Sequence, residues 1–175
     1  AILSLTFLAP NKIKKSFMIT ILLFCISIGI KNIQELSNKN INLSSGSNII
    51  YTTAYNGNSI KELVKYIDIN TKPEDRVLVY PENLSVNILS NRKSDNKFYS
   101  LIPLYIETFG EDLIVNRFEI TKPEYIVISN YDTSIYYYSY FGVDYAAKIT
   151  DYISKNYHKL TQIGDGLIFT IYKRN

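Results

Sequence analysis

The sequence predicts an α/β domain that is attached to a membrane by a preceding transmembrane helix. Three observations lead to this fold class. Residues 16–30 carry no charge and are far more apolar than anything that follows them. Two short apolar runs, 76–80 and 125–129, alternate with segments of helical periodicity, and residues 158–172 form two strand-like runs around a Gly-Asp-Gly turn. Together they predict a three-layer architecture with a mostly parallel sheet and a C-terminal antiparallel hairpin.

The transmembrane helix is predicted over residues 13–36. With lysines at both ends reaching the interfaces, residues 13–33 span about 31 Å, which matches a hydrocarbon core of about 30 Å. The alternative is a buried core helix, but a helix without a polar face needs a larger protein around it than 175 residues supply. Residues 1–9 are a second apolar run, which we interpret as the end of a truncated span in a longer protein.

Lysines between the two apolar runs indicate the orientation. Lys12, Lys14 and Lys15 occupy a short loop that contains no acid, which the positive-inside rule places in the cytoplasm. The rest of the chain is then expected outside the membrane. A signal peptide is the alternative, although an apolar run precedes these lysines and residues 28–31 form a poor cleavage site.

Charge separates the two parts of the chain. The net charge of +3 arises within the first 37 residues, which hold four lysines and one acid and leave fifteen bases and fifteen acids for the remainder. A neutral domain gives no electrostatic reason to bind nucleic acid. Cys25, the single cysteine, lies in the predicted span, so we expect the exterior domain to be stable without disulfides.

The exterior part begins with a predicted linker, residues 37–57, which is rich in Asn, Ser and Gly. Ser59 and Glu62 have the spacing of a capping box, so a helix is expected from there to about residue 70. Residues 58–175 are the predicted α/β domain. Its first strand, 76–80, is almost continuously apolar, as strands buried on both faces are.

The remaining elements alternate. We predict a helix at 84–90, a weaker strand at 98–100, a helix at 110–120 and a second strong strand at 125–129. A helix over 143–157 presents Ala146, Ile149, Ile153 and Tyr157 to the core, and the C-terminal hairpin follows it.

The known catalytic and metal-binding motifs are missing from the sequence. No dinucleotide-binding or phosphate-binding glycine motif occurs, and His158 is the single histidine, so a His/Cys metal cluster is impossible. We predict no cofactor and no metal. Four carboxylates at element ends, Glu82, Glu107, Asp132 and Asp144, are placed to line a cleft, and the alternative is that they cap turns and helices.

Residues 130–141 follow the second strong strand and hold five tyrosines and a phenylalanine. Open α/β sheets bind ligands at this carboxyl edge. Tyrosine rings there are suited to stack on sugar rings or to lie at lipid headgroups, and the alternative is a packed lid.

Five segments carry a resemblance to a known family. Residues 72–82, 91–94, 107–110, 122–127 and 140–145 resemble the extracytoplasmic C-terminal domain of bacterial membrane glycosyltransferases of the GT-C clan, which includes relatives of the protein mannosyltransferases and the aminoarabinose transferases. The resemblance covers most of residues 58–175.

The resemblance implies a chain in the bacterial plasma membrane whose domain lies on the extracytoplasmic side. The family transfers a sugar from a polyprenyl-phosphate donor to a glycan, lipid or protein acceptor. Its essential acids lie in an early exterior loop that has no counterpart here, so no catalytic residue is carried over. The resemblance therefore implies an accessory or acceptor-selecting domain, for which the candidate substrate-binding residues are Glu82, Arg92, Glu107, Asp132, Tyr136 and Tyr138. The alternatives are a membrane-tethered binding or sensor module without enzymatic activity and a secreted α/β domain.

Overall fold

The computed structural model describes residues 11–45, 48–82, 84–94 and 97–175. It divides into two compact units, residues 1–40 and 41–175. The apolar run at residues 1–9 lies outside the described residues.

The first unit contains helix α2, Asn11–Ser37. Its segment Lys15–Ser37 is long and apolar enough to cross a membrane. The hydroxyls of Thr20 and Ser27 donate to the carbonyls of Ser16 and Phe24 in the preceding turn, so these polar groups are satisfied within the helix. The expected helix over 13–36 lies within α2.

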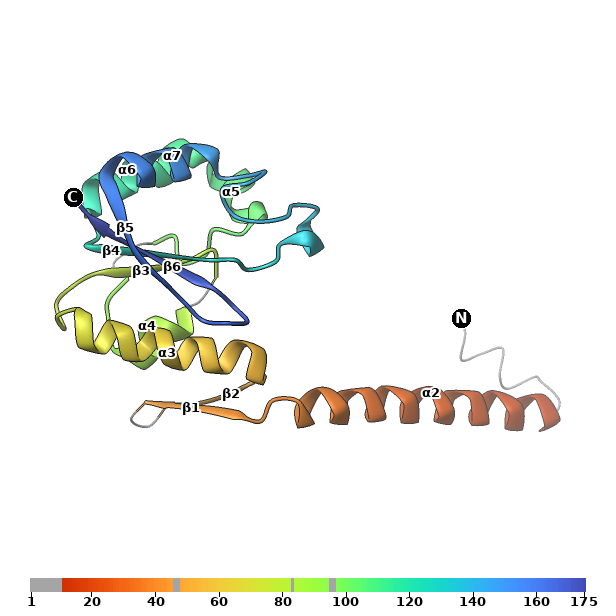
Figure 1. Ribbon diagram of the computed structural model, residues 1–175. Coiled ribbons are helices and arrows are strands. Elements are labelled where there is room, and N and C mark those ends of the chain that lie inside the picture. The colour runs from red at the N-terminus through yellow and green to blue at the C-terminus, as the bar shows by residue number, and fades with distance from the viewer. Residues whose placement is uncertain (1–10, 46–47, 83, 95–96) are drawn as a thin grey trace. The chain divides into compact units, whose positions relative to one another are not determined.

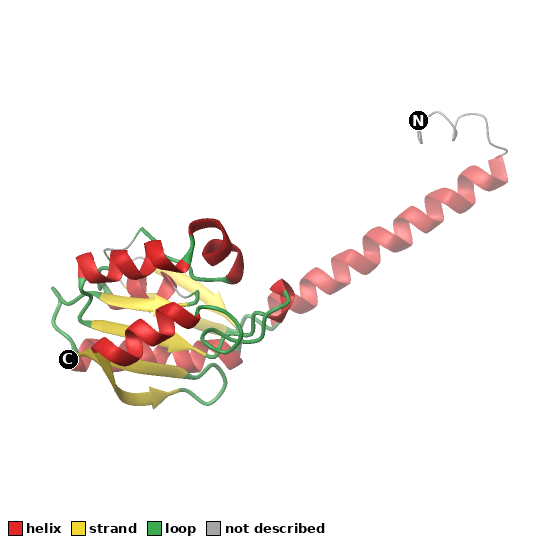
Figure 2. Ribbon diagram, turned by 90° about the horizontal axis from the view of Figure 1, so that it is seen from above, coloured by secondary structure: helices red, strands yellow, loops and turns green. Residues whose placement is uncertain are grey.

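The second unit is built on a four-stranded sheet of order β3-β4-β6-β5 (Figures 1 and 2). The strands are β3 (Val77–Tyr80), β4 (Tyr125–Ser129), β5 (Tyr157–Ile163) and β6 (Phe169–Arg174). Strands β3 and β4 are parallel, whereas β6 is antiparallel to both β4 and β5. A bulge between Lys159 and Thr161 interrupts the pairing of β5 with β6.

The sheet is therefore mixed, and the expectation of a mostly parallel sheet is wrong. The C-terminal hairpin places β6 directly against β4, which gives β4 an antiparallel neighbour. The weaker strand expected at 98–100 is also not formed, since only Ser100 pairs there, in an isolated antiparallel bridge with Glu82. The predicted C-terminal hairpin is confirmed.

Helices cover both faces of this sheet. Figure 1 shows α3 (Ala54–Asn70) and α4 (Leu84–Ser90) on one face, and α5 (Pro103–Phe109), α6 (Glu111–Thr121) and α7 (Ala147–Asn156) toward the other. Each face of the sheet has its own hydrophobic core. Alternate residues of β3 contribute to the two cores, because successive side chains of a strand point to opposite faces. Val77 and Val79 pack with α3 and α4, whereas Leu78 and Tyr80 pack with α6 and α7.

Residues 37–57, expected to be a linker, are largely structured. Strands β1 (Ile41–Ser45) and β2 (Asn48–Thr52) pair antiparallel, and α3 starts at Ala54. Leu43 is 3% exposed and belongs to the same core as α3. The hairpin is thus part of the compact unit that begins at residue 41.

Two helix starts differ from those expected. The capping-box interpretation of Ser59 and Glu62 is wrong, because Ser59 is buried inside α3 and the N-cap position is Thr53. Helix α7 starts at residue 147 instead of 143, because Ala146 has a left-handed backbone (φ 63°) that a helix cannot continue through. The four core residues expected from this segment, Ala146, Ile149, Ile153 and Tyr157, are all buried.

Candidate functional site

The candidate site lies where the parallel strands β3 and β4 end. Glu82 follows β3, and the loop 130–141 follows β4. Because the two strands are parallel neighbours, their carboxyl ends lie at the same edge of the sheet. The backbone N–H of Leu101 donates to the carbonyl of Pro81 (2.7 Å), which brings the segment before α5 to this edge as well.

The loop after β4 is held together by its own polar groups. Thr133 is fully buried, and its hydroxyl donates to the carbonyl of Ser139 (2.9 Å) across the loop. The Asp132 carboxylate accepts the backbone N–H of Ser134 (2.8 Å) at the start of the 3-10 helix η1, Ser134–Tyr136. Asp144 accepts the backbone N–H of Ser139 in the same way (2.8 Å). Asp132 and Asp144 therefore act as turn caps, as the alternative interpretation of the sequence proposed.

Tyr138 and Glu107 are two predicted site residues that the structure brings together. The Tyr138 hydroxyl donates to the Glu107 carboxylate at 2.9 Å, which links the loop to α5. This hydrogen bond raises the pKa of the Tyr138 phenol above its ordinary value, and the charges of Glu107 and Asp144 act in the same direction. The Tyr138 ring also lies 5.4 Å from the ring of Tyr145.

Glu82, Asp132 and Tyr136 gather around Tyr131. The pKa of the Tyr131 phenol is raised first by partial burial and then by the proximity of Glu82, Tyr136 and Asp132. The Tyr131 phenol thus lies close enough to two carboxylates, Glu82 and Asp132, for their charges to act on it. Tyr131 was not among the predicted site residues, although it lies in the predicted loop.

Sequence reasoning also missed a tyrosine pair that lies near Glu82. The hydroxyls of Tyr99 and Tyr105 lie 2.8 Å apart, and their rings meet edge to face at 5.8 Å. The hydrogen bond with Tyr99 is the main cause that raises the pKa of Tyr105, and Glu82 contributes to the shift. We name the five tyrosines of this region the tyrosine edge: Tyr99, Tyr105, Tyr131, Tyr136 and Tyr138.

A pocket of about 240 Å³ opens beside the tyrosine edge. It is lined by three apolar residues, Pro103, Ile106 and Ala146, and by acids and phenols, namely Glu107, Glu111, Asp144, Tyr138 and Tyr145. Ring faces attract the slightly positive C–H groups of a ligand, and carboxylates accept its hydroxyl protons. A sugar ring presents both kinds of group, so this combination suits a carbohydrate.

Arg92 does not belong to this site. Its Nε and Nη2 donate to the hydroxyl and carbonyl of Thr71, and Nη1 donates to the carbonyl of Ser90. Asp68 lies 3.8 Å away, and the Arg92 side chain is 8% exposed. Residues 92 and 93 lie at the amino end of β3, since Val77 N–H donates to the Lys93 carbonyl. Arg92 thus stabilises the opposite edge of the sheet.

The single histidine lies at the opposite end of the sheet from the candidate site, because His158 pairs with Lys173, which in turn pairs with Tyr125 at the start of β4. His158 Nδ1 lies 2.9 Å from the side-chain oxygen of Asn175 on the exposed edge strand β5. In the described part of the chain, no three His, Cys, Asp or Glu side chains are placed to hold a metal ion.

Comparison with protein-family models, with curated proteins and with solved structures found no match.

The buried phenol of Tyr145 leads to a prediction on alkaline stability. Burial is the main cause that raises its pKa from 10.0 to about 12, and Asp144 adds to the shift, whereas the neighbouring Thr133 opposes it. Its hydroxyl has no well-formed hydrogen bond within the described ranges. Because the folded-state pKa lies above the unfolded one, the stabilisation is complete below pH 10 and is lost as the pH rises toward 12.

We expect Tyr145→Phe to leave stability at pH 7 unchanged or slightly higher and to reduce the alkaline loss by at most about 2 kcal/mol. Urea unfolding of both chains between pH 8 and pH 12 measures this difference. Part of the alkaline loss should persist in the variant, because burial also raises the pKa of Tyr157. Identical pH curves for the two chains would show that Tyr145 is not the titrating group.

Proposed function

We propose that this chain supplies the exterior, sugar-binding domain of a bacterial membrane glycosyltransferase that uses a polyprenyl-phosphate sugar donor. The domain, a three-layer α/β unit in this proposal, lies on the extracytoplasmic side of the plasma membrane and is attached by α2. The observation that carries the proposal is the tyrosine edge with its carboxylates, above all the 2.9 Å contact of Tyr138 with Glu107 beside an acid-lined pocket. The resemblance of residues 58–175 to the GT-C clan supports the same class.

The proposed role is accessory. The carboxylates of the site are engaged by Tyr138, by Ser134 and by Ser139, so they hold the loop and leave acceptor positions for ligand hydroxyls. In this role the domain helps to hold the donor or to select the glycan, lipid or protein acceptor. The essential acids that the resemblance implies lie in an early exterior loop of the enzyme, outside this chain.

The double replacement Tyr136→Ala with Tyr138→Ala tests this role. In the complete membrane enzyme we expect kcat/KM to fall about 5- to 150-fold, or about 1–3 kcal/mol in transition-state stabilisation, through lost stacking and positioning. Ile135→Ala is the matched control, because Ile135 lies in the same loop and is 71% exposed. The melting curve of each variant is recorded beside its kinetics.

Three results would contradict the proposal. Wild-type kinetics with an unchanged melting curve in the double variant would remove the loop from function. Sugar transfer by residues 1–175 alone would show that catalysis resides in this chain. Labelling of a cysteine at Asn11, but not of one at Asn40, by an impermeant thiol reagent on intact cells would reverse the orientation.

A membrane-tethered binding module is the second candidate. It requires only two features that the structure describes, a helix that is long and apolar enough to span a membrane and the compact unit of residues 41–175. Saturation-transfer NMR with methyl hexosides on the chain in nanodiscs distinguishes the two candidates when combined with the kinetics. Sugar binding that depends on Tyr136 and Tyr138, without any effect of the double variant on transfer in cells, would favour the module.

A further inference from the structure

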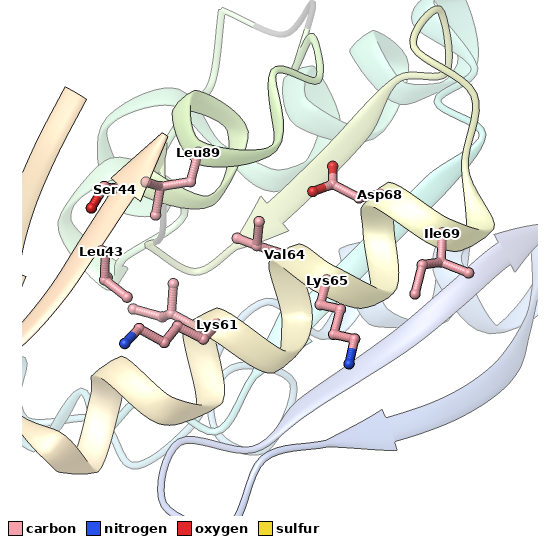
Figure 3. Close-up of a pocket in the computed structure, with 9 residues that line it drawn as sticks. Leu43, Ser44, Lys61, Val64, Lys65, Asp68, Ile69 and Leu89 are labelled. Carbon is pink, nitrogen blue, oxygen red and sulfur yellow. The ribbon is translucent and has the colours of Figure 1, made fainter. Parts of the chain in front are cut away.

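A second pocket lies on the opposite face of the domain from α6 and α7, between β1, α3 and α4. Its volume is about 260 Å³, and it is walled mainly by the apolar side chains of Leu43, Ile60, Val64 and Leu89. Figure 3 shows Leu43, Val64 and Leu89 converging from the three elements. An apolar cavity of about 150 Å³ is sufficient to hold benzene, so this one has room for a longer piece of hydrocarbon.

Two lysines of α3 line the same pocket. Lys61 and Lys65 are one turn apart, and Figure 3 shows their side chains leaving the helix in different directions, with the Lys61 amino group on the side of Leu43. The ion pairs of the described residues include neither of them, whereas Asp68 at the end of the pocket lies near Arg92. The pocket thus combines an apolar interior with a positively charged rim.

The rim also carries an exposed apolar side chain. Ile69 follows Lys65 on the same helical stripe and is 70% exposed, although it lines the pocket. Exposure of this much apolar surface to water is unfavourable. A ligand or an interface that covers the Ile69 side chain therefore lowers the free energy.

The covalent connection limits how far this pocket can be from the membrane. Leu43 is the sixth residue after Ser37, the last residue of α2, and six extended residues span at most about 22 Å. The segment Lys15–Ser37 is 23 residues long, about 35 Å as a helix, so it extends beyond a hydrocarbon core of about 30 Å. Lipid headgroups are therefore within reach of the pocket when the domain turns this face toward the bilayer.

We propose that this pocket binds an anionic phospholipid of the bilayer, with part of one acyl chain between β1, α3 and α4 and the phosphate on Lys61 and Lys65. The apolar interior, the unpaired lysines and the short connection to α2 each favour this occupant. The proposal rests on the membrane span of the proposed function, but it is independent of sugar binding, because the tyrosine edge and this pocket share no residue.

The experiment uses the full chain with Cys25→Ser and a single fluorophore-labelled cysteine. Ser44→Cys places the label at the pocket, and Ser134→Cys places it in the exposed loop after β4 as the control. The labelled chains are reconstituted in phosphatidylcholine vesicles that contain nitroxide-labelled phosphatidylglycerol or nitroxide-labelled phosphatidylcholine, with the nitroxide on the acyl chain. Flotation of the vesicles verifies that the chain is inserted.

We expect stronger quenching at position 44 than at 134, with a preference for phosphatidylglycerol over phosphatidylcholine. Lys61→Gln with Lys65→Gln should lower this preference by up to about 30-fold, since each lysine near an anionic membrane surface contributes about fivefold. Val64→Phe fills the pocket and should remove the quenching at position 44 for both lipids. Lys61 and Lys65 are exposed, so replacing them does not disturb the hydrophobic core. The lysine variants therefore test the proposal even if Val64→Phe impairs folding.

Equal quenching at positions 44 and 134 would overturn the proposal, as would a preference for phosphatidylglycerol that survives both lysine replacements. Quenching that a folded Val64→Phe chain retains would mean that the label touches the bilayer surface and that the pocket is empty of lipid. A chain that does not float with the vesicles would overturn the membrane span and this proposal together. Loss of sugar binding with intact lipid quenching would contradict only the proposed function.

Discussion

Replacing Phe118 with alanine is expected to lower the free energy of unfolding by about 3–5 kcal/mol. Phe118 in α6 is fully buried, and its ring lies 5.9 Å from that of Tyr80 and 6.0 Å from that of Tyr152. The ring therefore joins α6 to β3 and to α7 in one core. Its removal leaves a cavity at the centre of this contact and takes away two aromatic partners at once.

Ile120→Ala is the control for this prediction, because Ile120 lies two residues further along the same helix and is 65% exposed. Its effect should stay within about 0.5 kcal/mol. Urea unfolding of the detergent-solubilised chain, followed by near-ultraviolet circular dichroism of the tyrosines, measures both variants. Equal losses for the two replacements would indicate that α6 is not anchored through Phe118.

Replacing Gly57 with alanine should destabilise the domain by about 1–3 kcal/mol, although alanine is the better helix former. A Cβ atom at Gly57 would come within 2.5 Å of Ile41 Cγ2 and 2.9 Å of Thr52 Cγ2. It would also lie 2.8 Å from the Cβ of Ile41, so the backbone of the hairpin has to move. The first turn of α3 can therefore pack closely against the β1–β2 hairpin only because residue 57 has no side chain.

Asn58→Ala is the control, and it is expected to change the stability in the opposite direction. Asn58 is exposed in the same turn, so alanine there should stabilise the helix by a few tenths of a kcal/mol. Hydrogen exchange of β1 and β2 amides adds a local measurement, because protection of the hairpin should fall in Gly57→Ala and stay unchanged in Asn58→Ala. A stabilised Gly57→Ala chain would show that the hairpin does not rest on α3.

The Gly57 contact also explains why the hairpin could not be predicted from the sequence. Residues 37–57 are rich in Asn, Ser and Gly, and their apolar positions are few. Leu43 and Ile50 face each other in the hairpin register and become an apolar face only when α3 covers them. Strands β1 and β2 thus depend on tertiary contacts for their formation. Strands β3 and β4, in contrast, are apolar enough to be predicted from their own sequences.

The positions of some predicted site residues could be derived from the sequence, because strand direction determined them. Glu82 and the loop with Asp132, Tyr136 and Tyr138 follow two parallel strands, so their shared edge followed from the order of elements. Arg92 was misplaced because α4 reverses the chain and returns it to the start of β3. Tyr99 was missed because its segment was expected to be a strand and instead crosses the end of β3 as a loop.

The bulge between Lys159 and Thr161 has a consequence for how copies of this domain meet. Strand β5 is the outer strand of the sheet, and its outward row of backbone groups is a potential template for another chain. The bulge breaks the regular spacing that a docking strand would need, and the exposed Lys159 adds a charge beside it. The bulge and the charge thus protect the domains against joining edge to edge into continuous sheets.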